Sequence, residues 1–146
     1  MRKLVLFLAA ATMVAMPLAA NALGFGSIKL NSALGEPLDA RIELLSPTPD
    51  DISNLKVKLA PRTAFLRAGI DRPLFLEKLK FAVKQMEDGT YYIHVTTRER
   101  VREPFLDFLL EMEWRNGRMV REYTMLLDPP GTAPRTPAVV EAPATV

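Results

Sequence analysis

Few side chains in this 146-residue chain could carry out chemistry. The chain has one histidine, His94, and no cysteine, so a zinc site would need an unusual set of carboxylate ligands. His94 stands between Ile93 and Val95 on the alternate face of an expected strand, where a solvent-facing or edge histidine is the simplest interpretation. The sequence has no G-x-S-x-G segment and no glycine-rich phosphate loop. We therefore expect no catalytic residue, no cofactor and no metal, and a binding or structural module rather than an enzyme.

Carboxylates are the second group with chemical potential. Four of them should share one face of the last hairpin: Asp107, Glu111, Glu113 and Glu122. The expected pairing places Glu111 directly across from Glu122, and two close carboxylates can raise a pKa and supply an acid. On a flat, exposed sheet, however, water screens the charges and no cleft holds a substrate. We expect a solvated face here.

The third group is a row of arginines, Arg98, Arg100 and Arg102, in the segment T-T-R-E-R-V-R-E-P. Alternate positions of an extended chain share one face, so the three guanidinium groups should lie side by side. Two roles are open. If the acidic strand that follows lies alongside, the arginines could neutralise its carboxylates within the fold. If it does not, the row together with Glu103 is a surface that binds a partner protein.

The last hairpin of the domain should position the acidic residues. Asn116-Gly117 is expected to form a type I′ turn, because both residues tolerate a positive φ. Pairing about that turn sets apolar residues opposite each other: Trp114 with Met119, Leu110 with Tyr123, Phe108 with Met125, and Leu106 with Leu127. Trp114 and Tyr123 are therefore expected in the core. Arg121 is the exception on this apolar face.

Apolar residues alternate with polar ones through most of the middle of the chain, which is typical of half-buried strands. The expected strands surround residues 28–30, 38–44, 55–59, 79–83 and 91–97. Asp88-Gly89 marks a turn between the last two, and Pro61–Gly69 suits a short helix opened by proline and closed by glycine. About seven short strands with one short helix predict an all-β, immunoglobulin-like antiparallel sandwich, and a small β-barrel is the alternative.

Residues 1–22 have the pattern of a secretory signal peptide. A basic start at Arg2 and Lys3 precedes an apolar stretch, and Ala20-Asn21-Ala22 forms a small-residue cleavage site. We expect a cleavable signal and export to the periplasm, and no lipoprotein because there is no cysteine to carry the lipid. Removal of the signal leaves Lys and Arg equal in number to the 17 Asp and Glu, which disfavours a nucleic-acid partner.

The chain after the signal divides into two parts. Residues 23–128 should form one domain of ordinary size. Residues 129–146 are rich in proline, which lacks a backbone donor and favours extended conformers. A proline-rich disordered tail or linker is therefore expected after the domain.

Three segments resemble, in order, the N-terminal periplasmic domain of the FimV family: L-G-F-G-S-I-K-L-N-S-A-L-G-E-P-L-D-A-R-I-E-L-L-S, L-R-A-G-I-D-R-P, and V-R-E-P-F-L-D-F-L-L-E-M-E-W-R-N-G-R-M-V-R-E-Y-T-M-L-L-D-P-P. The resemblance covers Leu23–Pro130. It implies a Gram-negative envelope module that supports assembly of the type IV pilus and its outer-membrane secretin, polar organisation and twitching motility. It supplies no catalytic residues.

Longer members of that family add a LysM peptidoglycan-binding domain, a transmembrane helix and cytoplasmic tetratricopeptide repeats, none of which is in this sequence. Peptidoglycan binding through LysM is therefore not carried over, and the sequence is either a short member or part of a longer protein. Type IV pilus or secretin components are the partners that the resemblance implies, while the individual partner and self-association stay open. A periplasmic chaperone-like role or a cell-wall-binding adaptor is the alternative function.

Overall fold

The computed structural model describes residues 22–131. The predicted signal peptide, apart from Ala22, lies outside the described residues. The same holds for the predicted tail beyond Gly131. The described residues are those of the domain expected over residues 23–128, with one residue before it and three after it.

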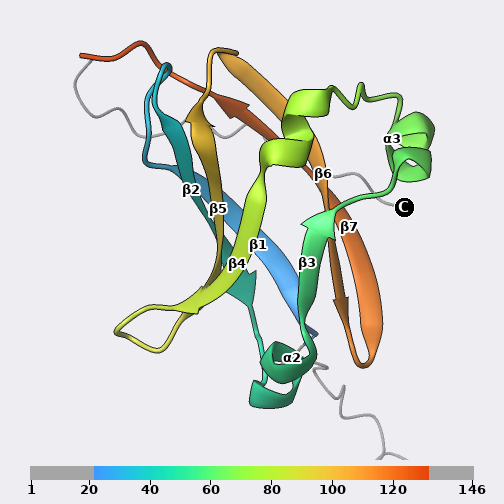
Figure 1. Cartoon of the computed structure of the whole chain (residues 1–146). Helices are drawn as coiled ribbons and strands as arrows, with labels where there is room; N and C mark the ends of the chain where they lie inside the picture. The colour runs from blue at the N-terminus through green and yellow to red at the C-terminus, as the bar shows by residue number, and fades with distance from the viewer. Residues whose placement is uncertain (1–21, 132–146) are drawn as a thin grey trace, which may run out of the picture.

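The described strands form two antiparallel sheets that face each other (Figure 1). The first sheet contains, in spatial order, β1 (Gly24–Leu30), β2 (Pro37–Leu45), β5 (Tyr91–Arg100) and β4 (Lys80–Gln85). The second sheet contains β3 (Lys56–Leu59), β6 (Phe105–Trp114) and β7 (Gly117–Leu126). The predicted antiparallel sandwich of seven strands is confirmed for this part of the chain, and the barrel alternative is not.

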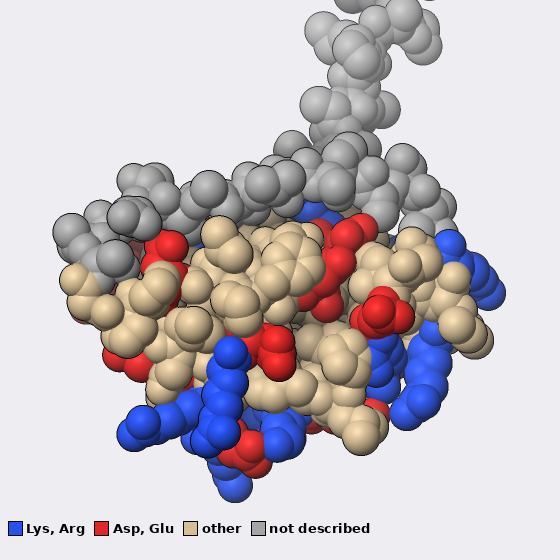
Figure 2. All heavy atoms as spheres, turned by 90° about the horizontal axis from the view of Figure 1, so that it is seen from above, with Lys and Arg blue, Asp and Glu red and all other residues tan. Residues whose placement is uncertain are grey.

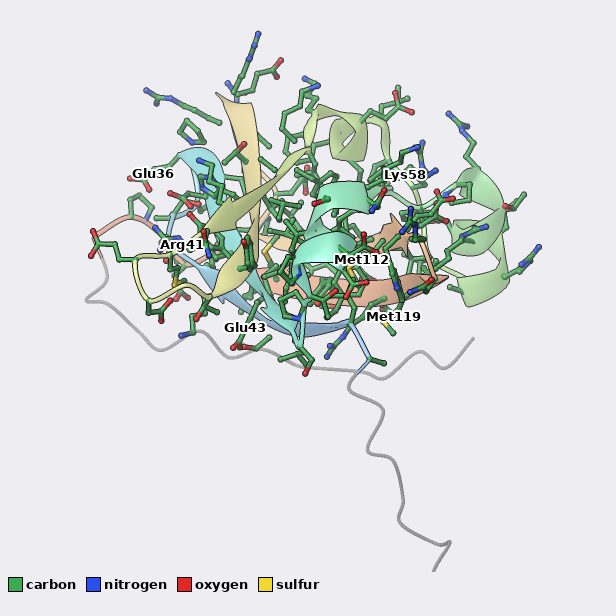
Figure 3. The ribbon with its side chains drawn as sticks, turned by 90° about the horizontal axis from the view of Figure 1, so that it is seen from below. Glu36, Arg41, Glu43, Lys58, Met112 and Met119 are labelled. Carbon is green, nitrogen blue, oxygen red and sulfur yellow. The ribbon has the colours of Figure 1, made fainter. Side chains whose placement is uncertain are left out.

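The core lies between the sheets, where the inward faces of the strands meet. β2 alternates buried and exposed residues, whereas β6, the middle strand of its sheet, is buried on both faces from Phe108 to Met112. The first sheet contributes, from β2, the buried residues Leu38, Ala40, Ile42 and Leu44. The second sheet contributes, from β6, the buried residues Leu106, Phe108, Leu110 and Met112. Figure 3 shows Met112 between the sheets, with Arg41 and Lys58 on opposite outer sides of the domain.

Short helices connect the sheets. α3 (Arg62–Ala68) confirms the predicted short helix, which follows Pro61 and ends at Gly69 in the left-handed conformation, with φ 70°. The sequence analysis did not predict α2 (Pro49–Asn54) or the 3₁₀ helix η1 (Leu74–Lys78). α2 begins with a capping box, in which the side chains of Thr48 and Asp51 each accept the backbone N–H of the other.

The predicted hairpin of β4 and β5 is confirmed. Lys80 pairs with Thr96 at one end, and Gln85 pairs with Tyr91 next to the turn. Gly89 has a φ of 87°, a conformation that favours glycine. The turn predicted at Asp88-Gly89 therefore forms, and its glycine adopts the positive φ.

The closing hairpin of β6 and β7 forms in a register different from the predicted one. Trp114 pairs with Gly117, so the turn residues are Arg115 and Asn116, and every later pair is shifted by two residues. The predicted type I′ turn is wrong, because neither Asn116 nor Gly117 has a positive φ. A shift of two residues leaves each side chain on its expected face. The apolar pattern could therefore not distinguish the two registers.

Gly117 is required by the packing of Trp114 rather than by its backbone angle. A Cβ atom at position 117 would lie 2.8 Å from Cζ2 of the Trp114 ring. The indole is half-buried and packs against the rim of the core. Tyr123 lies deeper, with only 3% of its surface exposed.

Arg121 and Tyr123 tie β7 to β1 across the sandwich. The Tyr123 hydroxyl donates to the Gly26 carbonyl oxygen at 2.8 Å, and the Arg121 guanidinium donates to the carbonyls of Phe25 and Gly26. The guanidinium also lies 5.3 Å from the centre of the Tyr123 ring. β1 is irregular between Phe25 and Ile28, and it is at this irregularity that the two carbonyls accept donors from β7. We call this arrangement the Gly26 joint.

The Gly26 joint predicts that Tyr123→Phe destabilises the domain by about 1–2 kcal/mol, because a buried carbonyl loses its best donor. Chemical denaturation of the full chain measures this cost. Tyr91→Phe is the matched control, since Tyr91 is half-buried and its hydroxyl has no described hydrogen bond. A loss for Tyr123→Phe no greater than that for Tyr91→Phe would contradict the assignment of the joint.

Candidate functional site

The predicted partner-binding row lies at the end of β5. Arg98 and Arg100 are exposed at the end of that strand, and Arg102 and Glu103 are exposed in the connection to β6. The arginines alternate with other residues, of which Thr97 and Val101 are buried, so their side chains lie outside the core. Seen from above, this end of the domain has Lys and Arg side chains gathered along one side (Figure 2).

Two acidic groups near the arginines, Glu99 and Glu36, are engaged elsewhere, while Glu103 next to Arg102 is exposed. The Glu99 carboxylate accepts a hydrogen bond from the Lys78 ammonium at 2.5 Å. The Glu36 carboxylate accepts the backbone N–H of Ala33 at 2.9 Å within its own turn. Within residues 22–131, the side chains of the arginine row form no ion pair and no hydrogen bond. The row is therefore a positive surface that the domain itself does not neutralise.

The hypothesis that the arginine row neutralises the carboxylates of the last hairpin is wrong. β5 belongs to the first sheet and β6 to the second, so the two consecutive strands do not lie alongside each other. The connection between them is fixed by backbone hydrogen bonds from Val101 to Glu36 and from Gly35 to Val101. Of the two roles left open by the sequence, binding to a partner remains.

Glu111 is not the solvated carboxylate that was expected. Its side chain is only 3% exposed and binds two cations, Lys58 at 3.0 Å from β3 and Arg118 at 2.6 Å from β7. These cations are more than half exposed, at 57% and 58%. A buried carboxylate is tolerated when it is paired in this way. Glu111 is therefore part of a structural ion-pair cluster, and it faces Val120 rather than Glu122 across the hairpin.

Glu122 and Asp107 form the remaining carboxylate pair on this face. Burial raises the pKa of Glu122, and the neighbouring Asp107 carboxylate raises it further. Asp107 also accepts a weak hydrogen bond from the Thr124 hydroxyl at 3.3 Å. The pair has the electrostatic property of an acid site, but it lies on the outward face of a sheet, and the Thr124 hydroxyl is the group described as bonding to it.

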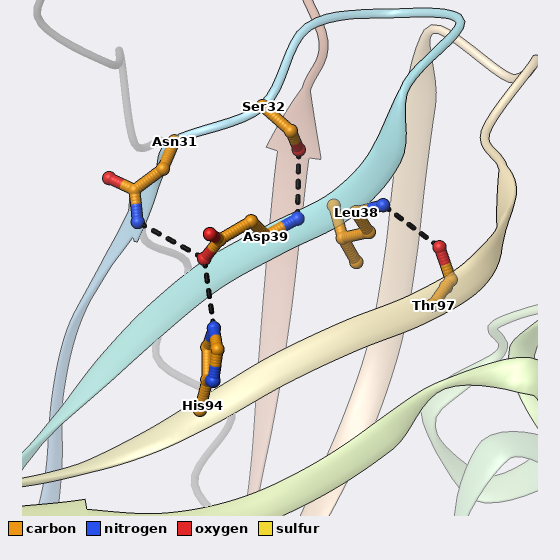
Figure 4. A network of polar contacts seen from close by, with 6 residues as sticks. All are labelled: Asn31, Ser32, Leu38, Asp39, His94 and Thr97. Carbon is orange, nitrogen blue, oxygen red and sulfur yellow. Dashed lines mark hydrogen bonds and ion pairs between the residues drawn. The ribbon is translucent and has the colours of Figure 1, made fainter.

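His94 is held by a polar network on the outward face of the first sheet (Figure 4). Its Nε2 lies 3.0 Å from Oδ1 of Asp39, and the Asn31 amide donates to the same oxygen. Burial raises the pKa of Asp39, but the hydrogen bonds from His94 and Asn31 outweigh it and leave the pKa lowered. His94 is half-buried rather than free in solvent. The network joins β2, β5 and the end of β1, and we assign it a structural role.

Within the part of the chain that the structure describes, no three His, Cys, Asp or Glu side chains are grouped so that they could hold a metal ion. No helix in this region is long and apolar enough to span a membrane. The arginine row thus remains the strongest candidate for a functional site in the described domain.

Comparison with known proteins identifies the family. A family model described as the FimV N-terminal domain, an immunoglobulin-like domain, matches residues 23–130. The chain belongs to the FimV family. The motility hub proteins FimV of two Pseudomonas aeruginosa strains, PAO1 and UCBPP-PA14, are each 43% identical to it over 138 residues.

The match covers most of this chain but a small part of its relatives. It covers 94% of this chain but only 15% of each FimV relative. No solved structure matches the chain. The likeness to FimV therefore concerns the immunoglobulin-like N-terminal domain, and the sandwich described above agrees with that class.

The raised pKa of Glu122 predicts a pH-dependent stability. The folded state favours the protonated acid, so the stability from this group is present below its unfolded pKa and is lost as pH rises through its folded pKa. Glu122→Gln should therefore raise the free energy of unfolding at pH 7 by up to about 1 kcal/mol. This gain should vanish near pH 3.5, where wild-type Glu122 is itself protonated.

Thermal and urea unfolding at both pH values measure the effect. Glu87→Gln is the matched control, because Glu87 is exposed in the β4–β5 turn and has no described ion pair. The interpretation fails if Glu122→Gln is no more stable than the wild type at pH 7, or if its gain persists unchanged in acid.

Proposed function

We propose that this FimV-family chain supplies a non-enzymatic interaction module of the periplasm that supports type IV pilus or secretin assembly, polar organisation and twitching motility. The observation that carries the proposal is the 43% identity to proteins named as motility hubs, which extends over 94% of the chain. Residues 1–22 would direct export as a cleavable signal, residues 23–128 would form the module, and residues 129–146 would serve as a proline-rich tail or linker.

The geometry supports an interaction role over a catalytic one. The titratable groups that could do chemistry are bound to each other in structural contacts, as in the Glu111 cluster with Lys58 and Arg118. His94 is bound to Asp39 in the same way. The arginine row, in contrast, is exposed and has no partner among the described side chains. We therefore place the contact with a pilus or secretin component at Arg98, Arg100, Arg102 and Glu103.

A chimeric protein tests the proposed function. The segment of Pseudomonas aeruginosa FimV that matches this chain would be replaced by residues 23–130, and the chimera would be expressed in a strain lacking its own FimV. We expect twitching zones close to those of the wild-type strain, because the module should supply the same contacts. FimV with this segment deleted is the control, and we expect it not to twitch.

Immunoblots of periplasmic and membrane fractions must accompany the motility assay. They show whether each protein is made, exported and present at the same level. A chimera that is exported at wild-type level but twitches no better than the deletion would contradict the proposed function.

A further inference from the structure

Positive charge is concentrated on the outward face of the first sheet. Residues on this face are identified by their alternation with the buried residues of β2, β4 and β5. The cations among them and on β1 are Lys29, Arg41, Lys80, Lys84 and Arg98. The carboxylates on the same face are Asp39 and Glu43, and Figure 3 shows Arg41 and Glu43 on the side of the domain opposite Lys58. Cations therefore predominate on this face.

The arginine row extends this positive face beyond the sheet. Lys80 pairs with Thr96, two residues before Arg98, so the lysine and the arginine are diagonal neighbours. The register of β5 shifts between Thr96 and Arg100, where Arg100 pairs with Pro37 of β2, and Arg102 follows in the connection to β6. We call Lys80, Arg98, Arg100 and Arg102 the basic strip. None of these side chains forms an ion pair within residues 22–131.

The carboxylates of the domain do not neutralise the basic strip. Asp39 is the carboxylate on the same face closest to Lys80, since both pair with Thr96, and it is bound to His94 and Asn31. The acidic residues of β6 and β7 lie on the outer face of the other sheet. A partner must therefore bring its own negative charge to this strip.

We infer that the basic strip is a docking surface for an extended acidic segment of a partner protein. The inference rests on the proposed function, because it names the chemistry of the partner at the site proposed above. Alternate residues of a strand lie about 7 Å apart. An extended peptide with Asp or Glu at alternate positions presents carboxylates at a similar spacing, and the long, exposed arginine side chains can reach them across the register shift at the end of β5. Arginine suits this role because its planar group binds a carboxylate through two hydrogen bonds.

The charge distribution favours a protein segment over a polyanion or a lipid surface. Apart from the predicted signal, positive and negative side chains balance, so the domain lacks the excess positive charge that draws nucleic acids or anionic membranes. Asp39 and Glu43 interrupt the positive face and would repel a uniformly negative surface. A peptide can avoid them by placing neutral residues opposite. A second copy pairing by the same strip would bring arginine against arginine, which is unfavourable.

Fluorescence anisotropy with the full chain tests the inference. The probe is a fluorescein-labelled ten-residue peptide of alternating glutamate and threonine, and a peptide of alternating lysine and threonine is its counterpart. We expect the acidic peptide to bind the chain at least tenfold tighter than the basic one, and binding to weaken as salt is raised from 0.05 to 0.5 M. The variant Arg98→Gln/Arg100→Gln/Arg102→Gln should lose at least tenfold in affinity.

The control variant is Lys56→Gln/Arg67→Gln/Arg115→Gln. It removes the same net charge from exposed positions outside the basic strip, and we expect less than a twofold loss. An equal loss in both variants would overturn the inference, because the attraction would then be non-specific. Binding to phosphatidylglycerol vesicles but not to the acidic peptide would also overturn it, in favour of a lipid surface. Circular dichroism verifies that both variants are folded.

The peptide-binding result and the twitching result of the chimera test the two proposals separately. If the unmodified chimera restores twitching but the peptide is not bound selectively, the acidic-segment inference fails and the proposed function stands. If the peptide is bound through the basic strip but the chimera is exported and does not twitch, the docking surface stands and the proposed function fails.

Discussion

The Gly26 joint is the contact on which the arrangement of the two sheets depends. A sandwich without cysteine has no disulfide to fix one sheet to the other, so packing and buried hydrogen bonds must do so. At the irregularity in β1, two carbonyl groups accept donors from Tyr123 and Arg121 of β7. A Cβ atom at Gly26 would lie 3.0 Å from Cβ of Glu43, so this close passage of β1 along β2 favours glycine. The joint thus fixes β1 relative to both β2 and β7.

The division into two sheets also decides how the charges are used. β6 lies between β3 and β7, and these neighbours supply Lys58 and Arg118 to the buried Glu111. β5 lies between β2 and β4, and the arginines at the end of this strand form no ion pair with a described carboxylate. The charged residues of β5 and β6, two consecutive strands, therefore differ: Glu111 of β6 is paired within the domain, and the arginines of β5 are not. One charge cluster stabilises the fold, and the other is left for a partner.

Much of this structure could be predicted from the sequence, because its strands follow a period of two. That period predicted the strands, their core faces and the sandwich, and Pro61 and Gly69 predicted α3. The same period could not fix the register of the last hairpin, since a shift of two residues preserves both faces. Sequence reasoning also missed α2, although Thr48 and Asp51 have the spacing of a capping box.

The candidate site was predicted only in part. The alternation of arginines was visible in the sequence, but whether the acidic strand would neutralise them depended on which sheet each strand joins. The burial of Glu111 depended on Lys58, which lies more than fifty residues away in the chain. Arg121 was visible as an exception on an apolar face, but its acceptors on β1 are defined only by the β1 irregularity. These are long-range contacts that no local pattern encodes.

Nuclear magnetic resonance of the full chain, labelled with nitrogen-15 and titrated with the acidic peptide, tests the docking surface most directly. We predict amide shift changes concentrated at Arg98–Glu103 and Lys80, with little change at Gly26 and Tyr123, because the Gly26 joint does not contact the peptide. Shift changes centred on β6 and β7, or spread evenly over the domain, would contradict the claim that the positive end of β5 is the docking surface.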